Sequence, residues 1–280
     1  MLGASFLFAT MGLCVKLASA HYGAAEIVMY RSLVGMLFIG VLMRSRGGTL
    51  RTGVPGMHFW RSVTGVVSLS LWFFAIGGLP LATAMTLNYM SSVWMAVFMI
   101  GGAVLAGGTR VDGRLLAAVL AGFAGVALVL RPTIDQQQLW HGLAGLLSGV
   151  LAALAYLQVT ALGRTGEPGY RIVFYFSALG SVAGFAIALA AGLHGHSWRG
   201  ASLLLAVGLL ATTAQLMMTR AYAVGRTLSN AALQYTGIGF ATAYGALWFD
   251  ERLTPTALAG VGLIAAAGLS ANLLRQRAGA

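Results

Sequence analysis

Charged side chains are scarce in this chain. Only 8% of its 280 residues are Asp, Glu, Lys or Arg, whereas a soluble domain carries about 25%. Acidic residues are the rarer sign, six against seventeen Lys and Arg, so that the net charge is +11. Because a water-facing surface cannot be assembled from so few charges, the composition excludes an ordinary soluble domain.

Other absences narrow the possible functions. A single cysteine, Cys14, excludes internal disulfides and a cysteine metal cage. The chain has no His-Glu-x-x-His motif, no phosphate-binding Walker loop and no nucleophile elbow, so we predict a protein that is not an enzyme and needs no metal or cofactor. Its arginines lie between apolar runs without interleaved aromatic residues, which argues against a nucleic-acid partner.

What the chain has instead is apolar sequence. Apolar residues make up 59% of the total and the mean hydropathy is +0.84. The apolar runs are roughly 18–25 residues long, which suits helices that cross about 30 Å of hydrocarbon. We predict an all-α integral membrane protein with ten transmembrane helices, at 2–20, 25–43, 61–78, 81–106, 113–131, 141–162, 171–192, 200–220, 227–248 and 255–274.

The arginines predict the orientation. With the N-terminus inside, twelve of them, Arg61 included, fall on the cytoplasmic side and three fall on the opposite side. The positive-inside rule therefore places both termini on the cytoplasmic side of a bacterial-type inner membrane. Residues 2–20 have no positive charge before their apolar stretch, so we expect a helix there rather than a signal peptide.

The chain also repeats itself. Residues 26–32 (EIVMYRS) match residues 171–177 (RIVFYFS), residues 87–89 match 233–235, and Gly125 matches Gly268, at offsets of 145, 146 and 143. These matches define two five-helix repeats, 1–132 and 140–277. Because five is odd, the second repeat enters the membrane upside down. Secondary transporters are often built from such inverted repeats, with the substrate site near the midplane between them.

Several motifs carry a resemblance to a known family. They are Lys16, Arg31, the run AIGGLPLATA at 75–84, Ala221-Tyr222, the run DERLT at 250–254, and Gly260 with Gly268. With them the chain resembles the drug/metabolite transporter superfamily, specifically the EamA-type ten-helix transporters. It departs from the family pattern at Gly107-Gly108, where an acidic residue is common. The resemblance covers nearly the whole chain and implies transport of amino acids, nucleosides, vitamins or other metabolites, in either direction.

Two cations within predicted spans are the first candidate site. Lys16 lies near the outer end of its helix and Arg31 lies a turn or two from that same side, so both should reach a similar depth. Charges inside a span are costly and are functional candidates by default. We predict that Arg31, assisted by Lys16, binds an anionic group of the substrate. The alternative is that Glu26 neutralises one cation and that both only anchor the outer rim.

Two amide–tyrosine pairs are the second candidate site. Asn88-Tyr89 and Gln234-Tyr235 occupy matching positions, and each lies roughly 10 Å deep from opposite faces of the bilayer. An amide donates and accepts hydrogen bonds, and a tyrosine adds a flat apolar face with a polar tip. We predict that they line the substrate cavity, the alternative being hydrogen bonding between helices. Two aromatic residues complete the predicted substrate-binding set, Trp94 and Tyr156.

The predicted function is secondary transport of a small amino-acid-like, zwitterionic or anionic solute, with export as one direction and alternating access as the mechanism. The alternative within the same class is an uptake carrier for a vitamin, nucleoside or nucleotide-like metabolite. In a different class, the chain would be an intramembrane enzyme or a non-transporting accessory subunit. The predicted partners are the solute and the lipid bilayer, with a homodimer through the peripheral helices 113–131 and 255–274 as a further possibility.

Overall fold

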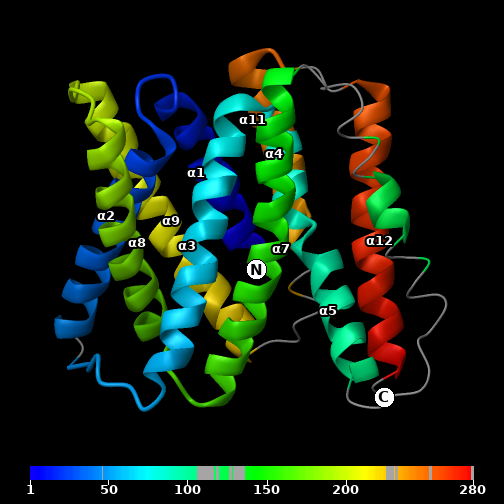
Figure 1. The fold of residues 1–280 in the computed structure, drawn as a ribbon, viewed down its shortest axis with the longest axis horizontal. Coiled ribbons are helices and arrows are strands. Elements are labelled where there is room, and N and C mark those ends of the chain that lie inside the picture. The colour runs from blue at the N-terminus through cyan, green and yellow to red at the C-terminus, as the bar shows by residue number, and fades with distance from the viewer. Residues whose placement is uncertain are drawn as a thin grey trace.

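The computed structural model describes residues 1–45, 47–105, 117, 120–125, 128, 136–224, 230, 233–251 and 254–278. These residues form a bundle of α-helices (Figure 1). The helices are α1 (Leu2–Ala18), α2 (Ala24–Ser45), α3 (Pro55–Gly78), α4 (Leu81–Tyr89), α5 (Ser91–Leu105), α7 (Gln136–Arg164), α8 (Gly169–Ala191), α9 (Trp198–Val224), α11 (Thr236–Phe249) and α12 (Pro255–Ala278).

The predicted all-α class is confirmed for the described residues. Among the described residues, five helices are long and apolar enough to cross a membrane, namely α2, α3, α7, α8 and α9. Helix α1 is apolar but shorter. The predicted span 113–131 lies largely outside the described residues.

Three predicted boundaries are wrong. Helix α3 begins at Pro55 rather than at residue 61, because proline is well tolerated in the first helical turn, where its missing N–H needs no partner. The predicted span 81–106 is divided at Met90 into α4 and α5. Helix α11 begins at Thr236, after a turn at Tyr235, rather than running unbroken from 227. The two interruptions fall directly after or within the amide–tyrosine pairs.

The two halves of the chain interleave instead of forming separate lobes. Helix α3 packs on α7 and α8, while α1 and α2 both pack on α9. Helix α4 packs on α7, and α11 packs on α1. Helices α5 and α12 pack together at one edge of the bundle (Figure 1). The core therefore lies mainly among α1–α4, α7–α9 and α11, where side chains from both halves meet.

The crossing of α2 and α8 is unusually close. A β-carbon placed on Gly35 would lie 2.9 Å from Oγ of Ser177, and one placed on Gly180 would lie 2.5 Å from Oγ of Ser32. Small residues let helix backbones approach in this way. The contact is also reciprocal, because Ser32 and Ser177 match in the two halves, as do Gly35 and Gly180.

Candidate functional site

A narrow cavity lies among α1–α4 and α7–α9. Its volume is about 50 Å³, which accommodates only a few water molecules. Neither Asn88 nor Gln234 faces outward, since their exposed fractions are 3% and 2%. The polar side chains on the cavity wall include Arg31, Arg61, Trp72, Asn88, Tyr156 and Gln215.

Two arginines share one aromatic ring on this wall. The Cζ atoms of Arg31 and Arg61 lie 4.8 and 4.6 Å from the centroid of the Phe176 ring, within the range of a cation–π interaction. Both arginines are buried, each with 3% of its surface exposed. Within the described residues, neither guanidinium belongs to an ion pair, and Nε of both and Nη1 of Arg61 have no hydrogen-bond partner.

The described carboxylates lie away from these arginines. Glu26 is bonded to His194, whose Nδ1 lies 2.9 Å from its Oε2 and whose backbone N–H donates to Oε1 over 3.3 Å. The alternative in which Glu26 neutralises Lys16 or Arg31 is therefore wrong for this structure. The other acidic residues are paired elsewhere (Glu167, Glu251), exposed (Asp250) or outside the described residues (Asp112, Asp135).

The sequence prediction missed Arg61 because it placed this residue in a cytoplasmic connection. Pro55 is the signal that could have indicated this, because a helix that begins at Pro55 places Arg61 almost two turns inside the helix. Gly65, one turn further along α3, provides room for its side chain. A β-carbon on Gly65 would collide with Nη1 of Arg61 and would contact the Phe176 ring.

Lys16 lies in a different environment from Arg31. Its Nζ forms an ion pair with Glu251 and donates a hydrogen bond of 2.7 Å to the Leu79 carbonyl. The other oxygen of Glu251 accepts the backbone N–H of Leu81 over 2.8 Å. We call Lys16, Leu79, Leu81 and Glu251 the Lys16–Glu251 cluster. Lys16 is not among the residues that line the cavity, and its role as a substrate ligand stays a prediction.

The two residues of the first amide–tyrosine pair have different roles. Asn88 lines the cavity and also donates a hydrogen bond of 3.0 Å to Oγ of Ser148 on α7. Tyr89 is buried with 1% exposure, and its ring fills the space beside Gly237. Asn88 is thus both a wall residue and a link between helices.

The second pair supports the wall from behind. Gln234 accepts a hydrogen bond from Tyr222 and donates one to the Tyr156 hydroxyl, each over 3.3 Å. The rings of Tyr156 and Tyr222 stack with centroids 5.4 Å apart. Tyr235 is buried with 7% exposure. Gln234 therefore orients Tyr156, which lines the cavity.

Of the eight predicted site residues, the structure brings Arg31, Asn88 and Tyr156 to the cavity wall. Trp94 instead packs against Phe98 and Phe123, with ring centroids 6.3 and 5.0 Å away.

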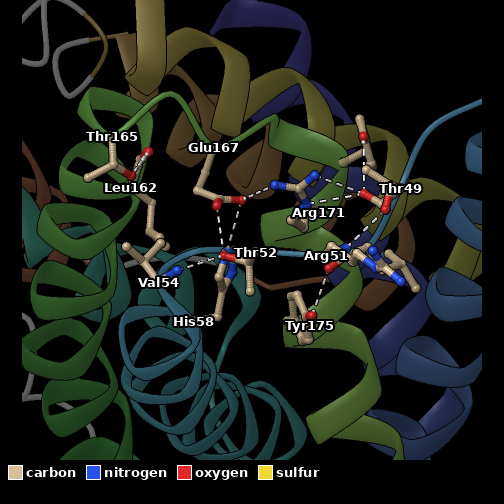
Figure 2. A network of polar contacts seen from close by, with 12 residues as sticks. Thr49, Arg51, Thr52, Val54, His58, Leu162, Thr165, Glu167, Arg171 and Tyr175 are labelled. Carbon is tan, nitrogen blue, oxygen red and sulfur yellow. Dashed lines mark hydrogen bonds and ion pairs between the residues drawn. The ribbon is translucent and has the colours of Figure 1, made fainter.

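A second polar cluster joins the connections that precede α3 and α8 (Figure 2). Glu167 accepts hydrogen bonds from Thr52 and Arg171 over 2.7 and 2.8 Å, and Nε2 of His58 lies 3.2 Å from its Oε2. We call these four residues the Glu167 cluster. Burial of Glu167 opposes its ionisation, but the contacts with Thr52, Arg171 and His58 outweigh burial and lower the pKa of its carboxyl group.

The two clusters lie at opposite ends of α3. The Glu167 cluster includes His58 in its first turn, and the Lys16–Glu251 cluster includes Leu79, which follows its last residue. A helix of this length spans about 36 Å. The cavity with Arg31 and Arg61 lies along α3 between them.

The chain is similar to transporters over most of its length. It is 34% identical over 274 residues, 98% of this chain and 94% of the relative, to a pseudopaline exporter, CntI, from Pseudomonas aeruginosa. The chain belongs to the same transporter family as this exporter. It is a membrane transporter of a small metabolite. Its named relatives are transporters rather than enzymes, which agrees with the prediction that the chain is not an enzyme.

Two further relatives and one solved structure agree. A riboflavin transporter from Rhizobium johnstonii is 30% identical over 215 residues, covering 76% of this chain and 68% of the relative. An uncharacterised transporter from Helicobacter pylori is 25% identical and covers 95% and 91%. No protein-family model matches the chain. A crystal structure that is 17% identical superposes with a TM-score of 0.66 over 98% of this chain and 97% of that one, which shows a shared fold.

Proposed function

We propose that this transporter exports a small anionic or zwitterionic metabolite across the bacterial inner membrane by alternating access. The observation that carries the proposal is the pair of buried guanidinium groups on the cavity wall, Arg31 and Arg61, which form no ion pair among the described residues. An unpaired cation in such a place is costly. An anionic group of the solute would supply the missing charge, and the exporter among the relatives favours the outward direction.

The proposal includes an inverted-repeat architecture of the EamA type. It is supported by the reciprocal contacts Gly35–Ser177 and Gly180–Ser32 at the α2–α8 crossing. A contact that recurs between the counterparts of both residues is typical of a two-fold axis. The helix pairs α3–α7 and α1–α9 also correspond in the two halves, as do α5–α7 and α1–α11. An axis of this kind in the membrane plane is common in secondary transporters.

The clusters at the two ends of α3 support alternating access. In this structure both are formed, and the cavity between them is too small for a metabolite. A solute can enter only when helices move apart on one side. We propose that opening toward the cytoplasm separates the Glu167 cluster and that opening toward the outside separates the Lys16–Glu251 cluster, with the other cluster kept intact each time.

A metabolite comparison tests this function. Cells that overexpress the wild type should accumulate a solute in the medium, and cells with Arg31→Gln should not, because the substitution removes the charge and the bidentate donor that hold the anion. Arg164→Gln, at the exposed end of α7, is the matched control and should export normally. The solute identified should then move in proteoliposomes that contain only this protein.

Two outcomes would change the proposal. Solute that accumulates inside the cells would favour uptake, the direction suggested by the riboflavin transporter among the relatives. Equal export by the wild type and a stably folded Arg31→Gln variant would show that Arg31 is a structural residue and not a ligand.

A further inference from the structure

We infer that the solute of this cavity carries two negative charges and that Arg61 binds it together with Arg31. This inference rests on the proposed function and specifies the substrate class of the same site. Arg61 was not among the residues that the sequence predicts for the site, and it comes from a different helix, α3 rather than α2.

The first argument is the position of the two charges. Each guanidinium carbon lies within 5 Å of the same ring centroid, that of Phe176, so the two cations are no more than about 10 Å apart, a distance that one small molecule can bridge. Arg31 is held on α2 and Arg61 on α3, and Phe176 on α8 lies against both. The solute that neutralises them would therefore contact three helices from both halves of the chain.

The second argument is the balance of charge. A monoanion would leave one of the two buried guanidinium groups uncompensated, and a neutral solute would leave both. No described carboxylate can neutralise these guanidinium groups instead of the solute, because Glu26, Glu167 and Glu251 are bonded elsewhere and Asp250 is exposed. Two negative charges on the solute complete the pairing.

The third argument is the kind of polar atom left free on the wall. Among the described residues that line the cavity, the buried side-chain atoms without a hydrogen-bond partner are Arg31 Nε, Arg61 Nε and Nη1, Trp72 Nε1 and Gln215 Nε2. All of them are donors. A solute that satisfies them has to present acceptor oxygens, which carboxylate and phosphate groups supply.

Simple acids can test the charge requirement on the purified, detergent-solubilised protein. Linear dicarboxylates from succinate to suberate would be titrated against monocarboxylates of the same chain length, with thermal unfolding as the readout and chloride at equal ionic strength as the control. Methyl phosphate would be added as a compact dianion. At least one dianion should raise the unfolding temperature more than its matched monoanion. A preference for methyl phosphate would place both charges on one group.

Substitution of each arginine separates the two ligands. Arg61→Gln and Arg31→Gln should each weaken the affinity for the best dianion by about tenfold or more and bring it close to that of the monoanion, because one charge-assisted pair is lost. Arg164→Gln should leave the affinity unchanged. Gly65→Ala should also weaken it, because the new β-carbon displaces the Arg61 guanidinium.

The inference is overturned by equal binding of matched mono- and dianions, by binding of neither above the chloride control, or by an Arg61→Gln variant that retains the preference. If Arg61→Gln does not fold, Arg61→Lys takes its place. It keeps the charge and should keep the preference for the dianion at lower affinity, and loss of the preference would contradict the charge argument. Export that depends on Arg31 but not on Arg61 would leave the proposed function intact and refute only the second charge.

Discussion

Removing either partner of the Lys16–Glu251 ion pair should destabilise the transporter more than removing one partner of a surface ion pair would. Glu251 follows α11 in the second half of the chain and holds Lys16 on α1 and the first residue of α4. Among the described residues, Lys16→Met leaves the carboxylate with only the Leu81 N–H as a partner. Glu251→Gln leaves the ammonium with the Leu79 carbonyl but with no counter-charge from the described part of the chain.

The magnitude follows from the burial of the pair. Removing one partner of a fully buried ion pair costs about 3–5 kcal/mol, and exposed pairs contribute at most about 1 kcal/mol. The side chains of Lys16 and Glu251 are 17% and 13% exposed, so each single substitution should cost about 2 kcal/mol after allowance for solvent screening. For a chain of this size, that corresponds to a fall of about 4–8 °C in the unfolding temperature.

The assay is a double-mutant cycle on thermal unfolding in detergent. Lys16→Met combined with Glu251→Gln should recover part of the loss, because no uncompensated charge then remains. Additive effects, or single variants as stable as the wild type, would refute the reasoning. A Lys16→Met variant of normal stability that has lost transport would instead support the predicted role of Lys16 as a substrate ligand.

Three further predictions concern packing, pH and topology. Gly184→Ala should cost about 1–3 kcal/mol, because its β-carbon would lie 2.8 Å from backbone atoms of Met29, whereas Gly40→Ala, with open space beside it, should be tolerated; equal unfolding temperatures would contradict this. The lowered pKa of Glu167 means that its stabilising contribution is present above its unfolded pKa and is lost as the pH falls, so stability should drop below about pH 5 and Glu167→Gln should flatten that decline. An unchanged loss of stability at low pH in the Glu167→Gln variant would assign the decline to other groups. A fluorescent reporter fused after Arg277 should be bright in the cytoplasm, and an active alkaline phosphatase at the same point would overturn the charge-based topology.

The membrane class and most of the helices could be predicted because they depend on local sequence. Runs of apolar residues and their lengths are enough to place a helix such as α8 within about two residues of its observed end. The exact start of α3 was harder, because an apolar window does not register the weakly polar turn between Pro55 and Arg61. That error of six residues hid a buried arginine.

The partners of the polar residues could not be predicted, because they are set by packing between distant segments. Glu251 lies 235 residues from Lys16, and His194 lies 168 residues from Glu26. Depth in the membrane, which the sequence does indicate, placed Lys16 and Arg31 at a similar level, but depth alone does not say which way a side chain points around its helix. The repeat was the better guide, since it located Asn88 and Gln234 in the interior.

The contact between Arg31 and Phe176 has a consequence for how such a site can arise. The two residues occupy equivalent positions in the two halves, 145 residues apart, and they touch. In a symmetric dimer of identical chains, a contact between equivalent positions pairs a residue with a copy of itself, so arginine would meet arginine or phenylalanine would meet phenylalanine. A single chain that carries both halves is free of that restriction. In the proposed inverted-repeat arrangement, one side of the axis can therefore hold the charge and the other side the ring that accommodates it.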